Sequence, residues 1–203
     1  MIPQAKRHYD SEKAHGRCNQ VLDAAAVCFA RSGFHGASMA QISKEARMSA
    51  GHIYNYFPSK DAIILAFVER ESAYVTGILR DLEARDDPLQ ALLDEAPHRV
   101  NEVLDPQPWH VPLEMYAEAS RNPNIAARLM VYENSSRERL REIVKAGRAR
   151  RGLSVDGSLI DSRTDAIVVF FQGLSIRALN CQGMDRAAMA DAFCVAMRAL
   201  LMT

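Results

Sequence analysis

The sequence has little that marks a secreted, membrane-spanning or metal-binding protein. Its first 16 residues, MIPQAKRHYDSEKAHG, contain no apolar core of the kind that a signal peptide requires. Its apolar runs, such as AIVVFF at residues 166–171, are far shorter than the ~18–20 residues that cross a bilayer. We therefore expect a cytoplasmic protein with no membrane segment.

Patterns for metal binding and catalysis are also scarce. No Cys-x-x-Cys pair occurs, and no Cys/His spacing resembles a zinc site. The cysteines are Cys18, Cys28, Cys181 and Cys194, which we interpret as buried or idle thiols in a reducing compartment. No phosphate-binding loop and no nucleophile–base constellation is visible. The sequence predicts no metal, no cofactor and no enzymatic activity.

Strand patterns are missing as well, because no stretch alternates convincingly between apolar and polar residues. Glycines, prolines and capping residues instead divide the chain into pieces with helical spacing of apolar residues. The predicted fold is all-α, with about nine helices arranged as an N-terminal three-helix domain and a larger helical domain. We expect the helices at residues 14–32, 39–46, 50–57, 60–84, 88–104, 109–121, 123–151, 158–181 and 185–202.

Charge is balanced over the whole chain but not along it. The formal net charge is zero, yet residues 1–60 carry eight Lys/Arg against four acidic residues, and the remainder carries the opposite excess. Four of the six histidines also lie in residues 1–60. A basic N-terminal part joined to an acidic body is typical of a protein that meets a polyanion at one end. Chance is the alternative explanation of this asymmetry.

Two of the predicted helices are short and adjacent. The stretch from Ser38 to Gln41 has the Ser-x-x-Gln form of a capping box, so a helix begins at Met39. Ser49 can cap the next helix, and Pro58 ends it. Two short helices joined by a tight turn are the plan of a helix-turn-helix, whose second helix lies in the DNA major groove.

The second short helix divides into two faces. Ile53 and Phe57 are four residues apart and share one face, which we assign to the core. Away from it lie His52, Asn55 and Tyr56, with Tyr54 to the side. Small residues at positions 50 and 51 let this helix come close to DNA, while hydroxyl and imidazole groups bond base edges or phosphates. A merely solvated His52 and a Tyr54 packed against the first helix remain the alternatives.

The segment GFHGASMAQISKEARMSAGHIYNYFPSKD, residues 33–61, resembles the N-terminal signature of the TetR family of bacterial transcriptional regulators. The pattern S-x-G-x-x-Y-x-Y-F-x-S-K-D at residues 49–61 matches nearly residue for residue. The resemblance implies a dimer in which helices 1–3 bind DNA, helices 4–7 enclose a ligand pocket and helices 8–9 form the dimer interface. It divides the chain into a flexible tail (1–13), a DNA-binding domain (14–58) and a ligand-binding and dimerisation domain (59–203).

Carried over by position, the resemblance implies contacts with bases or nearby backbone for Ala50, Gly51, His52 and Tyr54. It implies phosphate contacts for Ser38, Tyr56 and Lys60. The predicted DNA-binding set is completed by Gln41, Arg47 and Asn55. Two positions depart from the family pattern: Ala40 replaces a basic residue that many members use for a base contact, and Arg47 replaces a frequent turn glycine. For Lys60 an ordinary solvated lysine is the alternative, and Arg47 either strains the turn or adds a phosphate contact.

The C-terminal part resembles the choline-responsive repressors more loosely, through LEMYAEASRNP at 113–123 and FFQGLSIRAL at 170–179. An aromatic cage for a quaternary ammonium, with charge from Glu114 or Glu118, is one possibility, and a larger apolar ligand is another. The candidate ligand-binding residues are Tyr74, Trp109, Met115, Tyr116, Met130, Phe170 and Phe171. Ordinary core packing is the alternative for all of them.

The last two predicted helices are apolar on more than one face and therefore need burial on two sides, one of them against a partner. The candidate dimer-interface residues are Ile167, Phe171, Leu174, Ala178, Phe193 and Met197. We expect a homodimeric repressor that an unknown small molecule releases from a palindromic double-stranded DNA operator. The alternatives are a DNA-binding regulator controlled by a protein partner, without a small-molecule effector, and an enzyme that uses a helical cavity.

Overall fold

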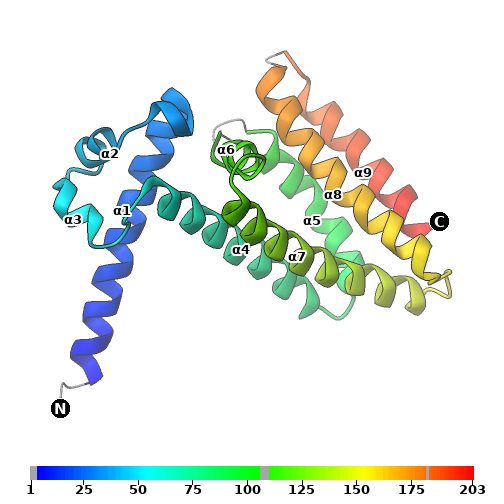
Figure 1. Ribbon diagram of the computed structural model, residues 1–203. Helices are drawn as coiled ribbons and strands as arrows, with labels where there is room; N and C mark the ends of the chain where they lie inside the picture. Colours follow the sequence, from blue (N-terminus) through cyan, green and yellow to red (C-terminus); the bar gives the residue numbers. More distant parts are fainter. Residues whose placement is uncertain (1–3, 106–109, 182) are drawn as a thin grey trace. The chain divides into compact units, whose positions relative to one another are not determined.

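The computed structural model describes residues 4–105, 110–181 and 183–203, and within these ranges the chain forms nine helices and no strand (Figure 1). They are α1 (Gln4–Gly36), α2 (Met39–Ala46), α3 (Ala50–Tyr54), α4 (Lys60–Glu83), α5 (Pro88–Val103), α6 (His110–Ala119), α7 (Pro123–Arg150), α8 (Gly157–Asn180) and α9 (Arg186–Met202). The predicted all-α fold is confirmed. α1 begins at Gln4, within the stretch 1–13 that the sequence assigned to a flexible tail.

The chain divides into two compact units. The N-terminal unit contains the described residues of 1–70 and 110–129, and so includes α1 to α3, the start of α4, all of α6 and the start of α7. The body unit contains the described residues of 71–109 and 130–203. This division differs from the boundary expected after residue 58, because α6 packs with α1 and belongs to the same unit.

The core of the N-terminal unit is built around Phe29 of α1. Its ring lies 5.5 Å from that of Phe34 and 6.0 Å from that of Phe67 on α4, measured between ring centroids. Ile42 of α2 and Ile53 of α3 are both fully buried. These apolar side chains hold α2 against α1 and α3 against α2. Such contacts are needed because helices of eight and five residues are not stable by themselves.

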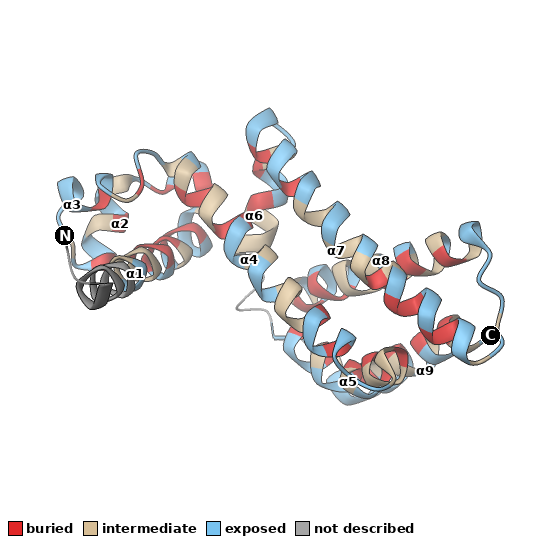
Figure 2. Cartoon of the chain, turned by 90° about the horizontal axis from the view of Figure 1, so that it is seen from below, coloured by how far each residue is buried: buried red, intermediate tan, exposed pale blue. Residues whose placement is uncertain are grey.

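The body unit has its own hydrophobic core, to which α4, α5, α7, α8 and α9 contribute. Its fully buried members include Leu89, Val144, Ile160 and Met197. Buried residues recur along these helices between exposed ones, as Figure 2 shows by colour. Gly147 permits a close approach of α7 to α5, since a Cβ atom at this position would lie 2.1 Å from the Cβ of Leu89.

Arg148 ties α7 to the end of α9 inside the body unit. Its side chain is fully buried, and its guanidinium donates hydrogen bonds to the backbone oxygens of Ser154 (2.9 Å), Leu201 (2.8 Å) and Thr203 (3.3 Å). Burial, with a smaller contribution from nearby Arg163, lowers the pKa of Arg148. Three carbonyl partners satisfy donors that would otherwise be costly to bury.

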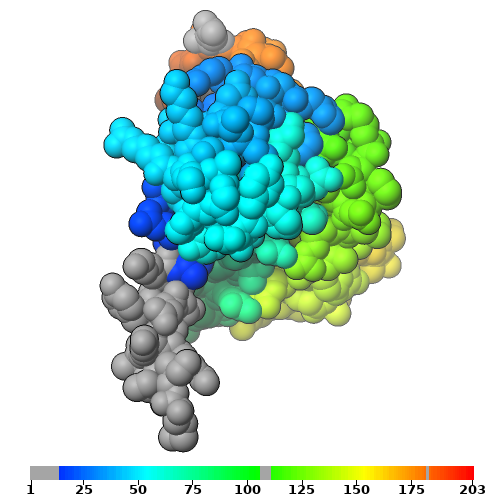
Figure 3. Space-filling model, turned by 60° about the vertical axis from the view of Figure 1, so that its left-hand side comes forward, coloured from blue at the N-terminus to red at the C-terminus, as the bar shows by residue number. Residues whose placement is uncertain are grey.

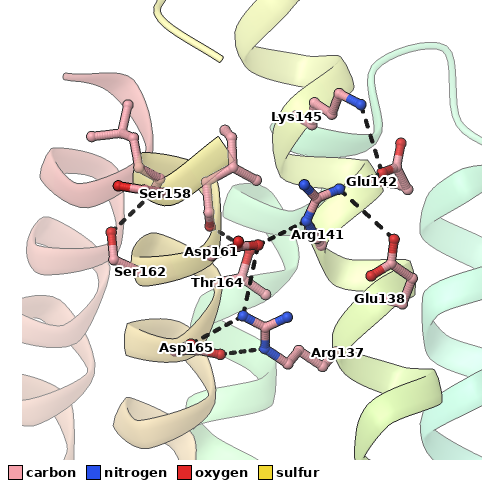
Figure 4. Close-up of polar contacts among 12 residues, drawn as sticks. Arg137, Glu138, Arg141, Glu142, Lys145, Ser158, Asp161, Ser162, Thr164 and Asp165 are labelled. Atoms are coloured by element: carbon pink, nitrogen blue, oxygen red, sulfur yellow. Dashed lines mark hydrogen bonds and ion pairs between the residues drawn. The ribbon is translucent and has the colours of Figure 1, made fainter. Parts of the chain in front are cut away.

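A row of ion pairs joins α7 to α8 on the surface of the body unit (Figure 4). Arg137 contacts Asp165 through two nitrogens, Nε at 2.5 Å and Nη2 at 3.0 Å, and Arg141 Nε donates to Asp161 at 2.8 Å. The forked contact fixes the two helices in register, because both guanidinium donors must meet both carboxylate oxygens. Among the residues that the structure describes, no helix is apolar enough over a sufficient length to cross a membrane.

Candidate nucleic-acid interface

The start of α2 is held by a capping box. The backbone N–H of Gln41 donates to Ser38 Oγ at 3.2 Å, and the backbone N–H of Ser38 donates to Gln41 Oε1 at 2.7 Å. Both side chains are exposed. Two residues predicted to contact DNA therefore also satisfy backbone donors at the helix start.

The turn between α2 and α3 contains a left-handed residue. Arg47 has φ 52° and ψ 41°, and it is the C-cap of α2. Ser43 Oγ donates to the carbonyl of Met48 at 2.5 Å and fixes the far side of the turn. The strained turn that the sequence left as one possibility is therefore present, and the exposed side chain of Arg47 remains available to a phosphate.

The faces of α3 divide as the sequence predicted. Ser49 Oγ accepts the N–H of His52 at 3.3 Å and so begins the helix. Ile53 is fully buried and Phe57 is 6% exposed, whereas Tyr54 is 49% exposed. Ala50, Gly51, His52 and Asn55 are exposed too. The region from α2 to the start of α4 forms the light-blue to cyan surface in Figure 3, so these groups are open to a ligand in solution.

α3 is shorter than predicted, ending at Tyr54 rather than at residue 57, although the N–H of Phe57 still donates to the carbonyl of Ile53 at 2.9 Å. One turn along, His52 and Tyr56 lie together, with Nε2 and the hydroxyl 3.4 Å apart and ring centroids separated by 5.4 Å. This contact pre-orients the two side chains. Tyr54 is exposed and Tyr56 is half-buried, so neither side chain packs fully into the core.

Lys60 has a role that the sequence did not predict. Its ammonium donates to the carbonyls of Phe34 and Ala37, both at 2.7 Å, and to that of His35 at 3.3 Å. It also lies 4.7 Å from the centroid of the Phe34 ring. All three ammonium hydrogens are thus engaged within the chain. The phosphate contact stays a prediction, and it requires the ammonium to exchange these carbonyls for a phosphate.

Glu114 and Glu118, which the sequence suggested as charges for a ligand, face the end of α1 instead. Glu114 Oε2 accepts the backbone N–H of Phe34 at 2.9 Å, and Glu118 Oε2 lies 3.0 Å from His35 Nε2. These contacts join residues about 80 positions apart. No local pattern signals them; the spacing of four residues, which puts both carboxylates on one side of a helix, was the only available hint.

The predicted ligand residues are not gathered into one cavity by the described parts of either unit. Met115 is buried and Tyr116 is 39% exposed in the N-terminal unit, while Tyr74 and Met130 of the body unit are 51% and 60% exposed. The hydroxyl of Tyr74 accepts a hydrogen bond from Arg99 Nη1 at 3.1 Å. Trp109 lies outside the described residues. Burial, then nearby Glu102, raises the pKa of Tyr74.

The remaining pair, Phe170 and Phe171, packs against Phe193 in the body core, with centroids 5.9 and 4.9 Å away. A hollow of about 230 Å³ opens between α7 and α8. It is lined by Glu133, Asn134, Arg137, Asp165, Val168 and Val169. Ligand pockets are typically larger, at about 300–1,000 Å³, and this lining shares no residue with the predicted ligand set.

The predicted dimer-interface residues face the chain's own core. Ile167, Leu174, Ala178, Phe193 and Met197 are all under 9% exposed, and Phe171 packs against the same cluster. The large apolar residues that α8 and α9 leave exposed are Val169, Ile176 and Val195, at 60%, 49% and 70% exposure. The two-sided apolar character that the sequence predicted for α8 is present, and the dimer interface stays a prediction.

No group of His, Cys, Asp and Glu side chains within the described ranges has the arrangement of a metal site. Two cysteines with raised pKa values, Cys18 and Cys28, lie in the N-terminal unit, where burial disfavours the thiolate. The candidate site is therefore the exposed surface of α2, α3 and their turn, which carries amide, hydroxyl, imidazole and guanidinium groups.

Family models match both parts of the chain. The model described as bacterial regulatory proteins, tetR family, matches residues 21–67. The model described as BetI-type transcriptional repressor, C-terminal, matches residues 86–201, more than half of the 203 residues.

Curated relatives match part of the chain. HTH-type transcriptional regulator UidR of Escherichia coli (strain K12) is 30% identical over 110 residues, which are 54% of this chain and 55% of that protein. HTH-type transcriptional regulator HbdR of Aromatoleum sp. (strain CIB) is 31% identical over 84 residues, 41% of this chain and 37% of that protein. The chain spans about half the length, or less, of these curated relatives.

Solved structures share the fold over most of the chain. Salmonella enterica GusR has a TM-score of 0.74 and 25% identity, covering 93% of this chain and 96% of that one. Bacillus subtilis FadR, in complex with stearoyl-CoA, has a TM-score of 0.72 and 19% identity over 88% and 96%. A putative regulator of Saccharomonospora viridis, in complex with choline, has a TM-score of 0.70 and 21% identity over 87% and 92%.

Proposed function

Since this chain belongs to the tetR family of bacterial regulatory proteins and is a DNA-binding transcriptional regulator, we propose that it is a homodimeric repressor which a small molecule releases from a palindromic operator. The observation that carries the operator-binding part is the division of α3. Ile53 is buried and anchors this helix, while Tyr54 beside it is half exposed. A helix anchored in this way presents polar groups to the major groove without rearranging the core.

The chemistry of the exposed groups supports different roles in binding. His52, Tyr54 and Asn55 carry donors and acceptors suited to base edges, and the small residues Ala50 and Gly51 permit close approach. Ser38 and Tyr56 carry hydroxyls, and Arg47 carries a fixed charge, all suited to phosphates. Gln41 retains its amide N–H₂ group for a polar contact while its oxygen caps α2.

The dimer is supported by apolar residues that the chain leaves exposed. Val169 and Ile176 are seven residues apart on α8 and therefore share a side of the helix with Gly173 between them. Val195 is the most exposed large apolar residue of α9. A partner that covers these side chains removes apolar surface from water. A two-fold axis between two copies matches the symmetry of a palindromic operator.

Control by a small molecule is proposed from the family and from the ligands of two structural neighbours. Stearoyl-CoA and choline are chemically unlike, so they support the existence of an effector but not its identity. An effector releases DNA only if it binds the DNA-free conformation more tightly than the DNA-bound one. Control by a protein partner is the competing proposal, and it predicts operator release by a protein fraction but by no small molecule.

Operator selection tests the proposal directly. Genomic fragments retained by the protein are sequenced, and the affinity for the enriched palindrome is measured by titration at several salt concentrations. Tyr54→Ala should weaken operator binding about 10- to 100-fold, the value of one good base contact. Tyr74→Ala makes the same chemical change at a similarly exposed position of the body unit and should leave the affinity unchanged. If both variants bind the operator as tightly as the wild type does, Tyr54 does not contact the operator.

A further inference from the structure

The turn that joins α1 to α2 interrupts the helical hydrogen-bond pattern. Gly33 has φ 69° and ψ 169°, a conformation that residues with a side chain rarely adopt. The chain then makes a short helical piece, residues 34–36, before Ser38 begins α2. Because this piece is one turn long, it cannot hold its own position by internal hydrogen bonds. Its partners in the rest of the N-terminal unit therefore decide where α2 begins.

The first partner is α6, at the N–H end of the turn. The break at Gly33 deprives the N–H of Phe34 of its helical acceptor, and Glu114 Oε2 accepts it instead at 2.9 Å. The same carboxylate lies beside Gly33, since a Cβ atom at this position would be in van der Waals contact with Glu114 Oε1 at 3.5 Å. A carboxylate at the N–H end of a helical piece also meets the favourable end of its dipole.

The second partner is α4, at the carbonyl end of the same turn. The ammonium of Lys60 bonds the carbonyls of Phe34, His35 and Ala37, as described above. A positive charge thus meets the carbonyl groups, and a negative charge meets the N–H group. The turn is polarised along its length and is held at both ends by full charges of the matching sign.

A third contact reinforces the side toward α6. The side chain of Glu118 is 7% exposed, and its Oε2 lies 3.0 Å from His35 Nε2 and 3.7 Å from Arg121 Nη2. The Glu118 oxygen and the His35 nitrogen are close without the alignment of a hydrogen bond. Glu114 and Glu118, one helical turn apart on α6, therefore contact the neighbouring residues Phe34 and His35.

We propose that Glu114 is a positioning residue for DNA binding: by bonding the N–H of Phe34 it fixes the turn from which α2 and α3 are placed, and so makes operator affinity depend on where α6 lies. The inference rests on the proposed operator binding. Glu114 itself does not touch DNA in this account. Its effect travels through the turn to Ser38, whose capping box begins α2 four residues beyond the bonded N–H.

The test compares Glu114→Ala with Glu114→Gln, and uses Glu69→Ala as a matched control. Glu69 is an exposed carboxylate of the same unit, paired with Arg128 at 2.8 Å. Two readouts are needed: hydrogen exchange of residues 34–38 in the free protein, and operator affinity with its salt dependence. Removing a negative charge near DNA by itself strengthens binding to a polyanion, so a weaker affinity in Glu114→Ala cannot come from charge alone.

Glu114→Ala should exchange on the order of tenfold faster at residues 34–38 and bind the operator roughly tenfold more weakly, with an unchanged salt slope. Glu114→Gln keeps an acceptor oxygen and should recover most of both effects, and Glu69→Ala should show neither. If hydrogen exchange at residues 34–38 is unchanged in Glu114→Ala, Glu114 does not hold the turn. If exchange there is faster but the operator affinity equals that of the wild type, Glu114 is not a positioning residue for DNA binding. If the wild type binds no genomic fragment, the proposed function fails, while the exchange readout still decides whether Glu114 holds the turn.

Discussion

Arg47 has a backbone conformation that costs free energy, and its exposed side chain carries a positive charge. Within the described residues it is the one non-glycine residue with a positive φ, and it lies where the helix-turn-helix turn reverses the chain. The left-handed conformation costs an L-residue about 1 kcal/mol relative to glycine, because Cβ approaches the carbonyl oxygen. Retention of a charged residue at such a position is consistent with a phosphate contact from its exposed side chain.

Arg47→Gly and Arg47→Ala separate the two contributions. Both variants lose the guanidinium, but only glycine relieves the strain at φ 52°. We expect the free energy of unfolding in urea to be about 0.5–1 kcal/mol higher for Arg47→Gly than for Arg47→Ala. If Arg47 binds a phosphate, both variants bind the operator more weakly and by the same factor, and their salt slopes fall by about one unit per lost contact. Equal unfolding free energies of the two variants would show that the turn relaxes without glycine.

At the scale of the elements, the ion pairs between α7 and α8 give part of the stability a dependence on pH. The hydrogen bond from Arg137, opposed by partial burial and aided by its charge, lowers the pKa of Asp165 below its usual value. Arg151 lowers the pKa of Asp87, the N-cap of α5, in the same way. A carboxyl whose folded-state pKa is lowered stabilises the fold above its unfolded-state pKa and loses that contribution as the pH falls.

Asp165→Asn should therefore lower the free energy of unfolding near pH 7 and converge with the wild type as the pH falls below about 4, the ordinary range of an aspartate. Because the Asp165 side chain is 55% exposed, the difference at pH 7 should be under about 1 kcal/mol. Urea unfolding at both pH values measures it. Asp81→Asn, at an exposed position of α4, should show no such convergence. A difference for Asp165→Asn that persists at low pH would point to packing rather than charge.

The elements also show which parts of the site the sequence could predict. The capping box of α2 and the buried pair Ile53 and Phe57 depend on residues three or four apart, so spacing alone identifies them. The contacts of Lys60 with Phe34 and of Glu114 with Phe34 span 26 and 80 residues. Such contacts follow from how the helices pack, which no local pattern contains. The length of α1 was missed for a related reason, since its polar N-terminal part lacks an apolar face.

For the whole molecule, the two apolar sides of α8 explain why the residues predicted for the dimer interface lie in the core of one chain. Spacing puts Ile167 and Leu174 on one side of α8 and Val169 on another. Only the packing of α5 and α9 decides which side is covered within one chain. Once Ile167 and Leu174 are buried in the body core, Val169 and Ile176 remain exposed. A regulator that keeps two large apolar groups in water, two turns apart on one helix side, is expected to cover them with a second copy.

Gly173→Glu tests this assembly, with Gly77→Glu as its control. Both glycines lie within helices, and a Cβ atom at either has nothing within 4 Å, so both substitutions fit the isolated chain. Each also gains up to about 1 kcal/mol of helix propensity, which therefore cannot explain a difference between them. Only Gly173→Glu places a charge between Val169 and Ile176, where a partner would have to bury it. Sedimentation at micromolar concentration should give a monomer for Gly173→Glu and a dimer for Gly77→Glu.

The same pair of variants connects assembly to function. Each half of a palindrome is bound by one copy, and joining the two copies makes the second contact intramolecular, which raises affinity by about 10²–10⁴-fold. Gly173→Glu should therefore lose operator affinity on this scale, although its surface of α2, α3 and their turn is unchanged. The loss should diminish as protein concentration rises. Gly77→Glu should bind as the wild type does. If Gly173→Glu sediments as a dimer and binds the operator as the wild type does, the exposed side of α8 is not the dimer interface.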